Sequence, residues 1–246
     1  MLVWIIIFSL LGSVGALLGA ALVLLLPENL RKILVANLIS YATGTLLGAV
    51  FLGLIPKALE KSSSPGILAW LLVGLLFFFV LEKLVLWRHC HVPGCDVHAS
   101  AGPLILIGDA FHNFTDGMII AGAFLLAMPL GIATGLAVIS HEIPQELGDF
   151  AILLESGYSR GQALLYNTLS ALATLPGALL AYYFLGHMMQ AVPYILLIGS
   201  ASFLYIALVD LTPYLHRRFG LADSLLQLGL ILAGIATIWL LHLPRH

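Results

Sequence analysis

The sequence predicts an all-α membrane protein that crosses the bilayer several times. Hydrophobic residues make up 61% of the 246 residues and charged residues only 9%, whereas a soluble domain of this size carries about 25% charged residues. Apolar stretches of about 20 residues, the length that an α-helix needs to span the hydrocarbon core, recur along the sequence. We therefore expect residues 1–246 to form a single transmembrane domain.

Eight spans are expected, separated by short segments rich in Pro, Gly, Ser and charged residues. Their approximate limits are Leu2–Leu26, Ile33–Ile55, Ile67–Trp87, Leu104–Met128, Gly131–Gly157, Gln162–His187, Tyr194–Leu211 and Ser224–Leu241. The first is interpreted as a retained helix, because the N-terminus lacks the basic segment and the small-residue cleavage site of a signal peptide. The 24 glycines would allow neighbouring helices to pack closely.

Basic residues predict the orientation of these spans. Seven lie in or beside odd-numbered loops: Arg31, Lys32, Lys83, Arg88, Arg160, Arg217 and Arg218. Three lie on the other side: Lys57, Lys61 and Arg245. Because cytoplasmic loops are enriched in Lys and Arg, we expect both termini outside. The expected location is the plasma (inner) membrane. The net charge of −2 argues against nucleic acid as a partner. Separately, lipid-facing stripes of Gly and Ala could pack two copies of the chain into a homodimer.

The third loop, residues 88–101, reads RHCHVPGCDVHASA and is predicted to be cytoplasmic. Its potential metal ligands are His89, Cys90, His91, Cys95, Asp96 and His98. Their spacing matches no closed zinc module, and two cysteines in one short loop imply no disulfide framework. The loop is therefore either a metal-capture or sensing tract or an ordinary polar loop that is rich in histidine.

The hairpin formed by residues 104–157 carries polar side chains near the centres of both its spans. They are His112, Asn113, Asp116, His141, Glu142, Gln145, Glu146 and Asp149. A carboxylate at this depth costs at least about 2.5–3.5 kcal/mol, so these residues point to a cation that passes through or binds there.

Helical spacing gathers these residues on one broad face of each span. His112 and Asp116 are four residues apart, as are His141 and Gln145, so each pair shares a helix face. A tight turn at Met128-Pro129-Leu130 would place residues whose numbers sum to about 258 at equal height. That register pairs Asp116 with Glu142, Asn113 with Gln145 and His112 with Glu146.

Imidazole and carboxylate are the ligands of borderline divalent cations, so Zn²⁺ is the expected cargo, with Fe²⁺, Mn²⁺, Co²⁺ and Cd²⁺ as alternatives. The donors exceed one tetrahedral site, and two adjacent metals sharing a carboxylate would use them all. The neutral donors Asn113 and Gln145 would keep binding reversible. Pro144 would free the Ser140 carbonyl and kink the helix. A polar network that only joins helices, or a proton pathway, are the alternatives.

Three further polar residues lie inside predicted spans. Asp109 and Asp210 fall near the cytoplasmic ends of spans four and seven, and they are interpreted as helix-end or gate groups, with contact to the metal as the alternative. Asn167 in span six is expected to make a structural hydrogen bond, with the polar cluster as an alternative partner.

The segments DAFHNFTDG and HEIPQELGDF, around His112 and His141, resemble the paired signatures HNxxD and HExPHExGD of the ZIP (Zrt/Irt-like) family of divalent metal transporters. The eight spans, outside termini and His-bearing third loop agree with that family. The resemblance implies uptake of divalent metal into the cytoplasm by an elevator-type motion. It also implies a binuclear site whose ligands would be His112, Asn113, Asp116, His141, Glu142 and Gln145; Glu146 matches a later acid of the motif.

The sequence departs from the family pattern at two sites. Gln145 replaces the second histidine of the motif, which bears on metal preference. Gly53 and Lys57 stand where relatives often carry His and Glu, which argues against an outer entry site.

No enzymatic activity is expected. A zinc metalloprotease is the natural rival, but its HExxH motif needs a histidine at position 145. Residue types alone leave the direction of transport open, so a proton-coupled exporter remains the alternative transporter.

Overall fold

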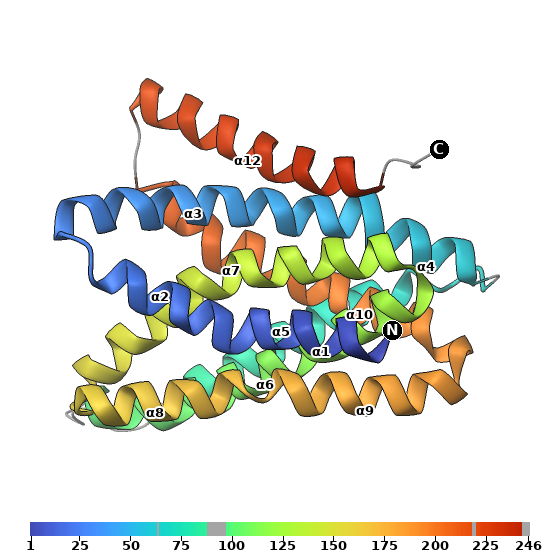
Figure 1. Ribbon diagram of the computed structural model, residues 1–246, viewed down its shortest axis with the longest axis horizontal. Coiled ribbons are helices and arrows are strands. Elements are labelled where there is room, and N and C mark those ends of the chain that lie inside the picture. The colour runs from blue at the N-terminus through green and yellow to red at the C-terminus, as the bar shows by residue number, and fades with distance from the viewer. Residues whose placement is uncertain (63, 88–96, 218–219, 243–246) are drawn as a thin grey trace.

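The computed structural model describes residues 1–62, 64–87, 97–217 and 220–242, and every regular element in this part of the chain is a helix (Figure 1). The predicted all-α class is confirmed. The helices lie side by side in one bundle, and most of them run along its long axis (Figure 1).

The helical elements follow one another with short breaks. Their bounds are α1 (Leu2–Leu10), η1 (Leu11–Gly15), α2 (Ala16–Leu24), α3 (Glu28–Gly48), η2 (Ala49–Leu54), α4 (Ile55–Lys61), α5 (Ala69–Trp87), α6 (Val97–Leu126), α7 (Met128–Glu155), α8 (Arg160–Ala171), α9 (Thr174–His187), η3 (Met189–Ala191), α10 (Val192–Tyr205), η4 (Ile206–Leu211), α11 (Thr212–Leu215) and α12 (Leu221–His242). Three short π-helical stretches, η1, η2 and η4, continue directly into the α-helices beside them.

Within the described residues, five helical segments are long and apolar enough to cross a membrane. They are Leu2–Leu24, Glu28–Lys61, Arg160–His187, Met189–Leu215 and Leu221–Leu241. Large apolar side chains such as Leu225, Leu232 and Trp239 are more than half exposed on α12, as expected for a surface that faces lipid. The chain is therefore an integral membrane protein.

The third loop is shorter than predicted, because α6 begins at Val97 and takes in residues 97–101. The rest of the histidine-rich tract, residues 88–96, lies outside the described residues. The extra helical turns lengthen α6 to 30 residues.

The turn between α6 and α7 also differs from the prediction. The break is the single residue Ala127, whose backbone is extended, with φ −162° and ψ 138°. Pro129 lies in the first turn of α7, where its missing N–H costs no hydrogen bond. Folding about residue 127 places residues whose numbers sum to about twice 127 at equal height. The three predicted pairings, His112 with Glu146, Asn113 with Gln145 and Asp116 with Glu142, are therefore wrong as a register, although the side chains of Asp116 and Glu142 still meet.

Glycines bring two pairs of helices into backbone contact. A Cβ atom on Gly117 of α6 would overlap the Thr174 carbonyl of α9, and one on Gly177 of α9 would overlap the Phe114 carbonyl of α6. The α3–α12 pair meets in the same way through Gly44 and Gly234. Close packing by small residues is the usual basis of helix association in lipid, and it fixes how α9 lies against α6.

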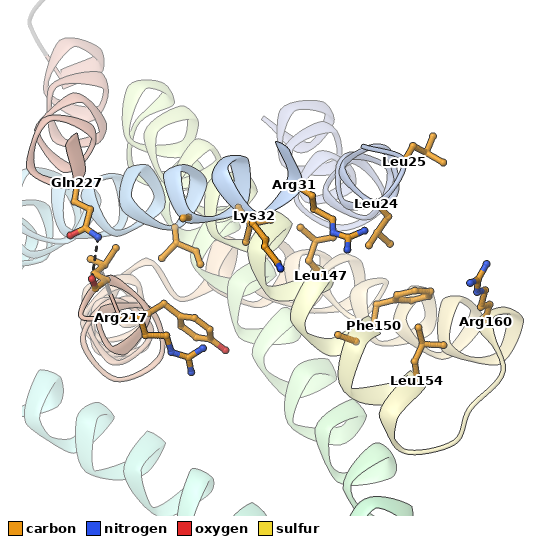
Figure 2. A pocket seen from close by; sticks show the side chains of 16 residues that line it. Leu24, Leu25, Arg31, Lys32, Leu147, Phe150, Leu154, Arg160, Arg217 and Gln227 are labelled. Atoms are coloured by element: carbon orange, nitrogen blue, oxygen red, sulfur yellow. Dashed lines mark hydrogen bonds between the residues drawn. The ribbon is translucent and has the colours of Figure 1, made fainter. Parts of the chain in front are cut away.

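The start of α1 and the end of α12 lie toward the same end of the bundle (Figure 1). Toward the opposite end, residues near the junctions α2–α3, α7–α8 and α11–α12 surround a common space (Figure 2). Those junctions hold Arg31, Lys32, Arg160 and Arg217, so much of the basic charge gathers at one end of the bundle.

Candidate metal centre

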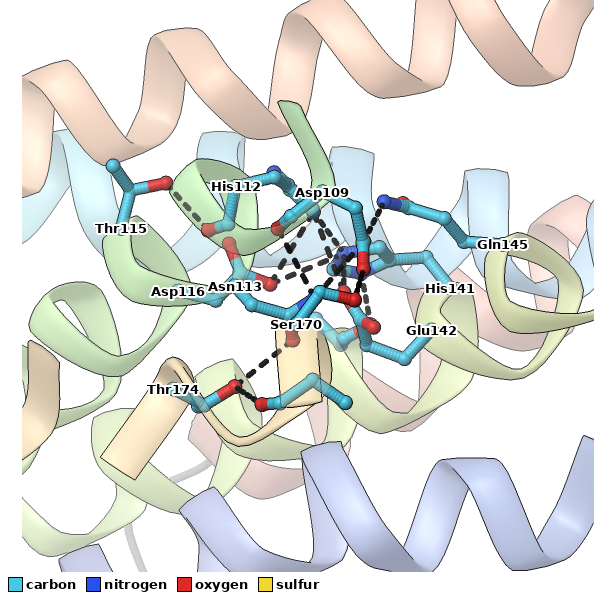
Figure 3. A network of polar contacts seen from close by, with 12 residues as sticks. Asp109, His112, Asn113, Thr115, Asp116, His141, Glu142, Gln145, Ser170 and Thr174 are labelled. Atoms are coloured by element: carbon cyan, nitrogen blue, oxygen red, sulfur yellow. Dashed lines mark hydrogen bonds and ion pairs between the residues drawn. The ribbon is translucent and has the colours of Figure 1, made fainter. Parts of the chain in front are cut away.

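Four side chains from the hairpin meet at one point. His112 and Asp116 come from α6, and His141 and Glu142 come from α7 (Figure 3). One donor atom of each lies within 4.8 Å of the other three. The side chains of Asp116, His141 and Glu142 are fully buried, and that of His112 is 13% exposed. We call these four residues the ligand cluster.

The spacing inside the ligand cluster matches a tetrahedral ion. The Nε2 atoms of His112 and His141 are 3.2 Å apart. Asp116 Oδ2 lies 3.2 Å from His141 Nε2 and 3.6 Å from His112 Nε2, and Glu142 Oε1 lies 3.4 Å from both. A tetrahedral Zn²⁺ with bonds of about 2.0–2.1 Å would hold its ligand atoms about 3.3 Å apart. These five distances, of 3.2–3.6 Å, are therefore close to those between the ligand atoms of one tetrahedral zinc ion.

One hydrogen bond orients His141 in the ligand cluster, whereas the two carboxylates of the cluster lack hydrogen-bond donors in the described part of the chain. His141 Nδ1 lies 2.9 Å from the Ala137 carbonyl oxygen, and an Nδ1–H that donates there leaves the Nε2 lone pair for a metal. Among the described residues, the carboxylate oxygens of Asp116 and Glu142 accept no hydrogen bond. Buried acceptors without donors are costly, and a cation at the centre would satisfy them.

A second network, of hydrogen bonds, surrounds Asp109, which lies about one helical turn before His112 on α6. Asp109 Oδ1 accepts hydrogen bonds from Asn113 Nδ2 at 3.0 Å and from Gln145 Nε2 at 3.1 Å. Its Oδ2 accepts one from the Ser170 hydroxyl at 2.5 Å. The Thr174 hydroxyl donates to Asn113 Oδ1 at 2.9 Å. The predicted ligands Asn113 and Gln145 thus bond to Asp109 rather than joining the ligand cluster.

Two of these partners, Ser170 and Thr174, were not predicted from the sequence. Each also bonds to the backbone carbonyl oxygen three residues before it, Asn167 for Ser170 and Ala171 for Thr174, which is a common local bond of Ser and Thr. Only the approach of α6 to α8 and α9 shows their link to the site, so the sequence carried no usable signal for them.

Glu146 lies on another side of α7. Asn167 of α8 donates through Nδ2 to the Glu146 carbonyl oxygen at 3.2 Å and also to the Glu146 carboxylate. The structural hydrogen bond expected for Asn167 is thereby confirmed. Of the seven predicted ligands, the structure brings four into the ligand cluster and gives Asn113, Gln145 and Glu146 other partners.

A cavity of about 250 Å³ adjoins the ligand cluster between α5, α6, α7, α10 and η4. Its wall includes His112 and Gln145 and four carboxylates: Glu82, Asp109, Asp149 and Asp210. No Lys or Arg lines it among the described residues. We call it the acidic cavity. Asp109 and Asp210, predicted as gate groups, both lie in its wall.

The sequence pattern of the family described as ZIP Zinc transporter matches residues 88–242. The chain belongs to the ZIP family. That assignment confirms the resemblance carried by the two motifs around His112 and His141. The matched region contains α6 and α7, so it includes the whole ligand cluster and all of the acidic cavity's lining except the α5 residues.

Several ZIP relatives align over part of this chain. Zinc transporter ZIP10 of Danio rerio is 37% identical over 150 residues, which is 58% of this chain and 18% of the relative. Zinc transporter ZIP4 of Homo sapiens is 46% identical over 110 residues, 45% of this chain and 17% of the relative. Zinc transporter ZIP13 of Pongo abelii is 35% identical over 187 residues, 75% of this chain and 55% of the relative. The chain thus spans less than a fifth of ZIP10 and ZIP4.

Proposed function

We propose that this chain transports Zn²⁺ across the membrane and that the ligand cluster is its binding site. The observation that carries the proposal is the convergence of His112, Asp116, His141 and Glu142 at spacings that suit tetrahedral zinc. The relatives are named zinc transporters. Fe²⁺, Mn²⁺, Co²⁺ and Cd²⁺ remain alternative cargoes, because the same donors bind them.

The ligand set favours transport over catalysis. A catalytic zinc site has three protein ligands and keeps its fourth position for water or substrate. The ligand cluster offers four protein donors, which leaves no open position. Gln145, the position that a metalloprotease would need as histidine, bonds to Asp109 instead.

The acidic cavity supplies a route to and from the ligand cluster. Its four carboxylates attract a divalent cation, and low-dielectric walls strengthen that attraction. His112 belongs both to the ligand cluster and to the cavity wall, so the two are continuous. Net movement into the cytoplasm is proposed from the family assignment, and a proton-coupled exporter is the alternative.

The proposed topology has eight spans with both termini outside. Besides the five apolar segments, α5, α6 and α7 have 19, 30 and 28 residues, and about 20 suffice to cross. Basic residues at one end of the bundle favour that end as cytoplasmic. The plasma (inner) membrane as location, the single domain over residues 1–246 and a homodimer remain predictions.

The test is zinc flux into liposomes that contain the purified protein and a trapped zinc-sensitive dye. We expect zinc entry with the wild type, none above empty liposomes with His141→Ala, and normal entry with Thr115→Ala. Thr115 is the matched control, because among the described residues its hydroxyl donates to the His112 carbonyl oxygen on the same helix and to no other group. Competition by Mn²⁺ and Cd²⁺ would rank the metals. Undiminished flux in a correctly folded His141→Ala protein would overturn the proposal.

A further inference from the structure

A second cavity, of about 860 Å³, lies between α2, α3, α7, α8, α11 and α12 (Figure 2). We call it the basic pocket. Its deepest side chains are Ile39 and Leu147, which are 6% and 9% exposed. Leu24, Val35 and Phe150 add to this apolar lining. The interior therefore suits hydrocarbon better than a polar solute.

Four cations stand around the basic pocket. Arg31 and Lys32 reach toward it from α3, Arg160 from α8, and Arg217 from the segment after α11 (Figure 2). No Asp or Glu lines the pocket among the described residues. Lys32 pairs with Glu28 at 2.5 Å on the exposed face of α3. The Arg217 guanidinium lies 4.5 Å from the centre of the Tyr214 ring, which helps to orient it.

This charge excludes the basic pocket as a route for the metal. A divalent cation would be repelled there, whereas the acidic cavity attracts it. An occupant that suits the pocket must carry negative charge for the rim and a long apolar part for the floor. Free phosphate meets the first condition only, since it would leave Ile39, Leu147 and Phe150 uncovered.

We propose that the basic pocket binds an anionic phospholipid. The arginines hold the phosphate, for which their guanidinium groups are well suited, and an acyl chain lies over Leu147 and Phe150. Basic pockets between membrane helices at the cytoplasmic surface are suited to acidic headgroups. The pocket lies where three helix junctions at the same end of the bundle meet, and the ends of membrane-spanning helices are where lipid headgroups are expected.

The proposal does not depend on zinc transport and is tested by lipid binding alone. The purified full chain in detergent would be mixed with dioleoyl-phosphatidylglycerol or dioleoyl-phosphatidylcholine, and bound lipid would be counted by native mass spectrometry. We expect preferential retention of phosphatidylglycerol. At about fivefold per cation, the double variant Arg31→Gln/Arg217→Gln should bind it about 25-fold more weakly.

Two further variants distinguish lipid binding in the pocket from attraction by positive charge in general and from loss of binding through misfolding. Lys57→Gln/Lys61→Gln removes two cations from α4, outside the pocket, and should retain the lipid as the wild type does. Ala151→Trp fills the apolar part of the pocket while keeping all four cations, and it should lose the lipid.

Three outcomes would overturn the proposal. One is equal retention of phosphatidylcholine and phosphatidylglycerol by the wild type. Another is equal loss of lipid from the α4 double variant and the arginine double variant. The third is displacement of the lipid by glycerol phosphate at equal concentration, which would show that a free phosphate suffices and the apolar floor contributes nothing.

Discussion

Helix α7 borders two cavities that carry opposite charge. One face of the helix places Gln145 and Asp149, four residues apart, in the wall of the acidic cavity. Another face places Leu147, Phe150 and Leu154 in the basic pocket. The acidic cavity is lined by carboxylates without Lys or Arg, and the basic pocket by Lys and Arg without carboxylates, within the part of the chain that the structure describes.

The comparison shows how one amphipathic helix can keep a cation and an anion apart. Charges that line a low-dielectric cavity act strongly on an ion inside it and weakly on a distant site, because solvent screens the longer path. Changes in the acidic cavity should therefore alter zinc handling, and changes in the basic pocket should not. The predictions below test this separation, from the largest expected effect to the smallest.

Removing a ligand should have the largest effect. Asp116→Asn replaces a buried, anionic acceptor that lies 3.2 Å from His141 Nε2, so zinc affinity should fall more than about 100-fold, since even outer-shell changes cost 10–100-fold. Isothermal titration of the purified protein with Zn²⁺ would measure it. Thr115→Ala on the same helix is the control. A loss of zinc affinity of less than tenfold would show that Asp116 is not a ligand of the site.

Reversing a charge in each cavity tests the separation directly. Asp210→Lys in the acidic cavity should lower the rate of zinc flux into liposomes about tenfold, because it repels the cation along its path. Arg217→Glu in the basic pocket should leave the rate within about twofold of wild type. Equal slowing by the two variants would break the comparison, since both cavities would then act on the cation.

A smaller effect is expected from loosening the packing of α9 against α6 than from changing the charges of the acidic cavity. Gly177→Val would force α9 away from the Phe114 carbonyl of α6, and overpacking of this kind costs about 1–3 kcal/mol. The apparent melting temperature of the purified protein should fall. Gly186→Val, on the same helix with open space around it, should leave it unchanged, and similar falls for both would show that the contact is unimportant.

The smallest effect is expected at Gln145. Gln145→Ala removes one hydrogen bond to Asp109, whose net value is about 0.5–1.5 kcal/mol, so zinc affinity should fall about threefold. Gln227→Ala, which removes a hydrogen bond to the Leu215 carbonyl beside the basic pocket, should not change it. A hundredfold loss for Gln145→Ala would instead make this amide a direct ligand.

Much of the site could be predicted from local spacing. Residues four apart share a helix face whatever surrounds them, so the sequence alone placed His112 with Asp116 on one face of α6 and His141 with Gln145 on one face of α7. Which residues of α6 meet which residues of α7 could not be predicted, because it depends on the turn. The break at Ala127 instead of Pro129 shifts the register by about one helical turn. That shift pairs His112 with Glu142 and Asp109 with Gln145.

The sequence by itself determined the all-helical membrane class, the family and the residue types of the site, because composition and i, i+4 spacing are local properties of the chain. The tertiary structure decided which donors converge and which do not. It directed Asn113 and Gln145 to Asp109, brought Ser170 and Thr174 to the same network, and gave α7 a cavity of opposite charge on each of two faces. These features depend on contacts between helices, such as the glycine contact of α6 with α9, whose register no single segment encodes.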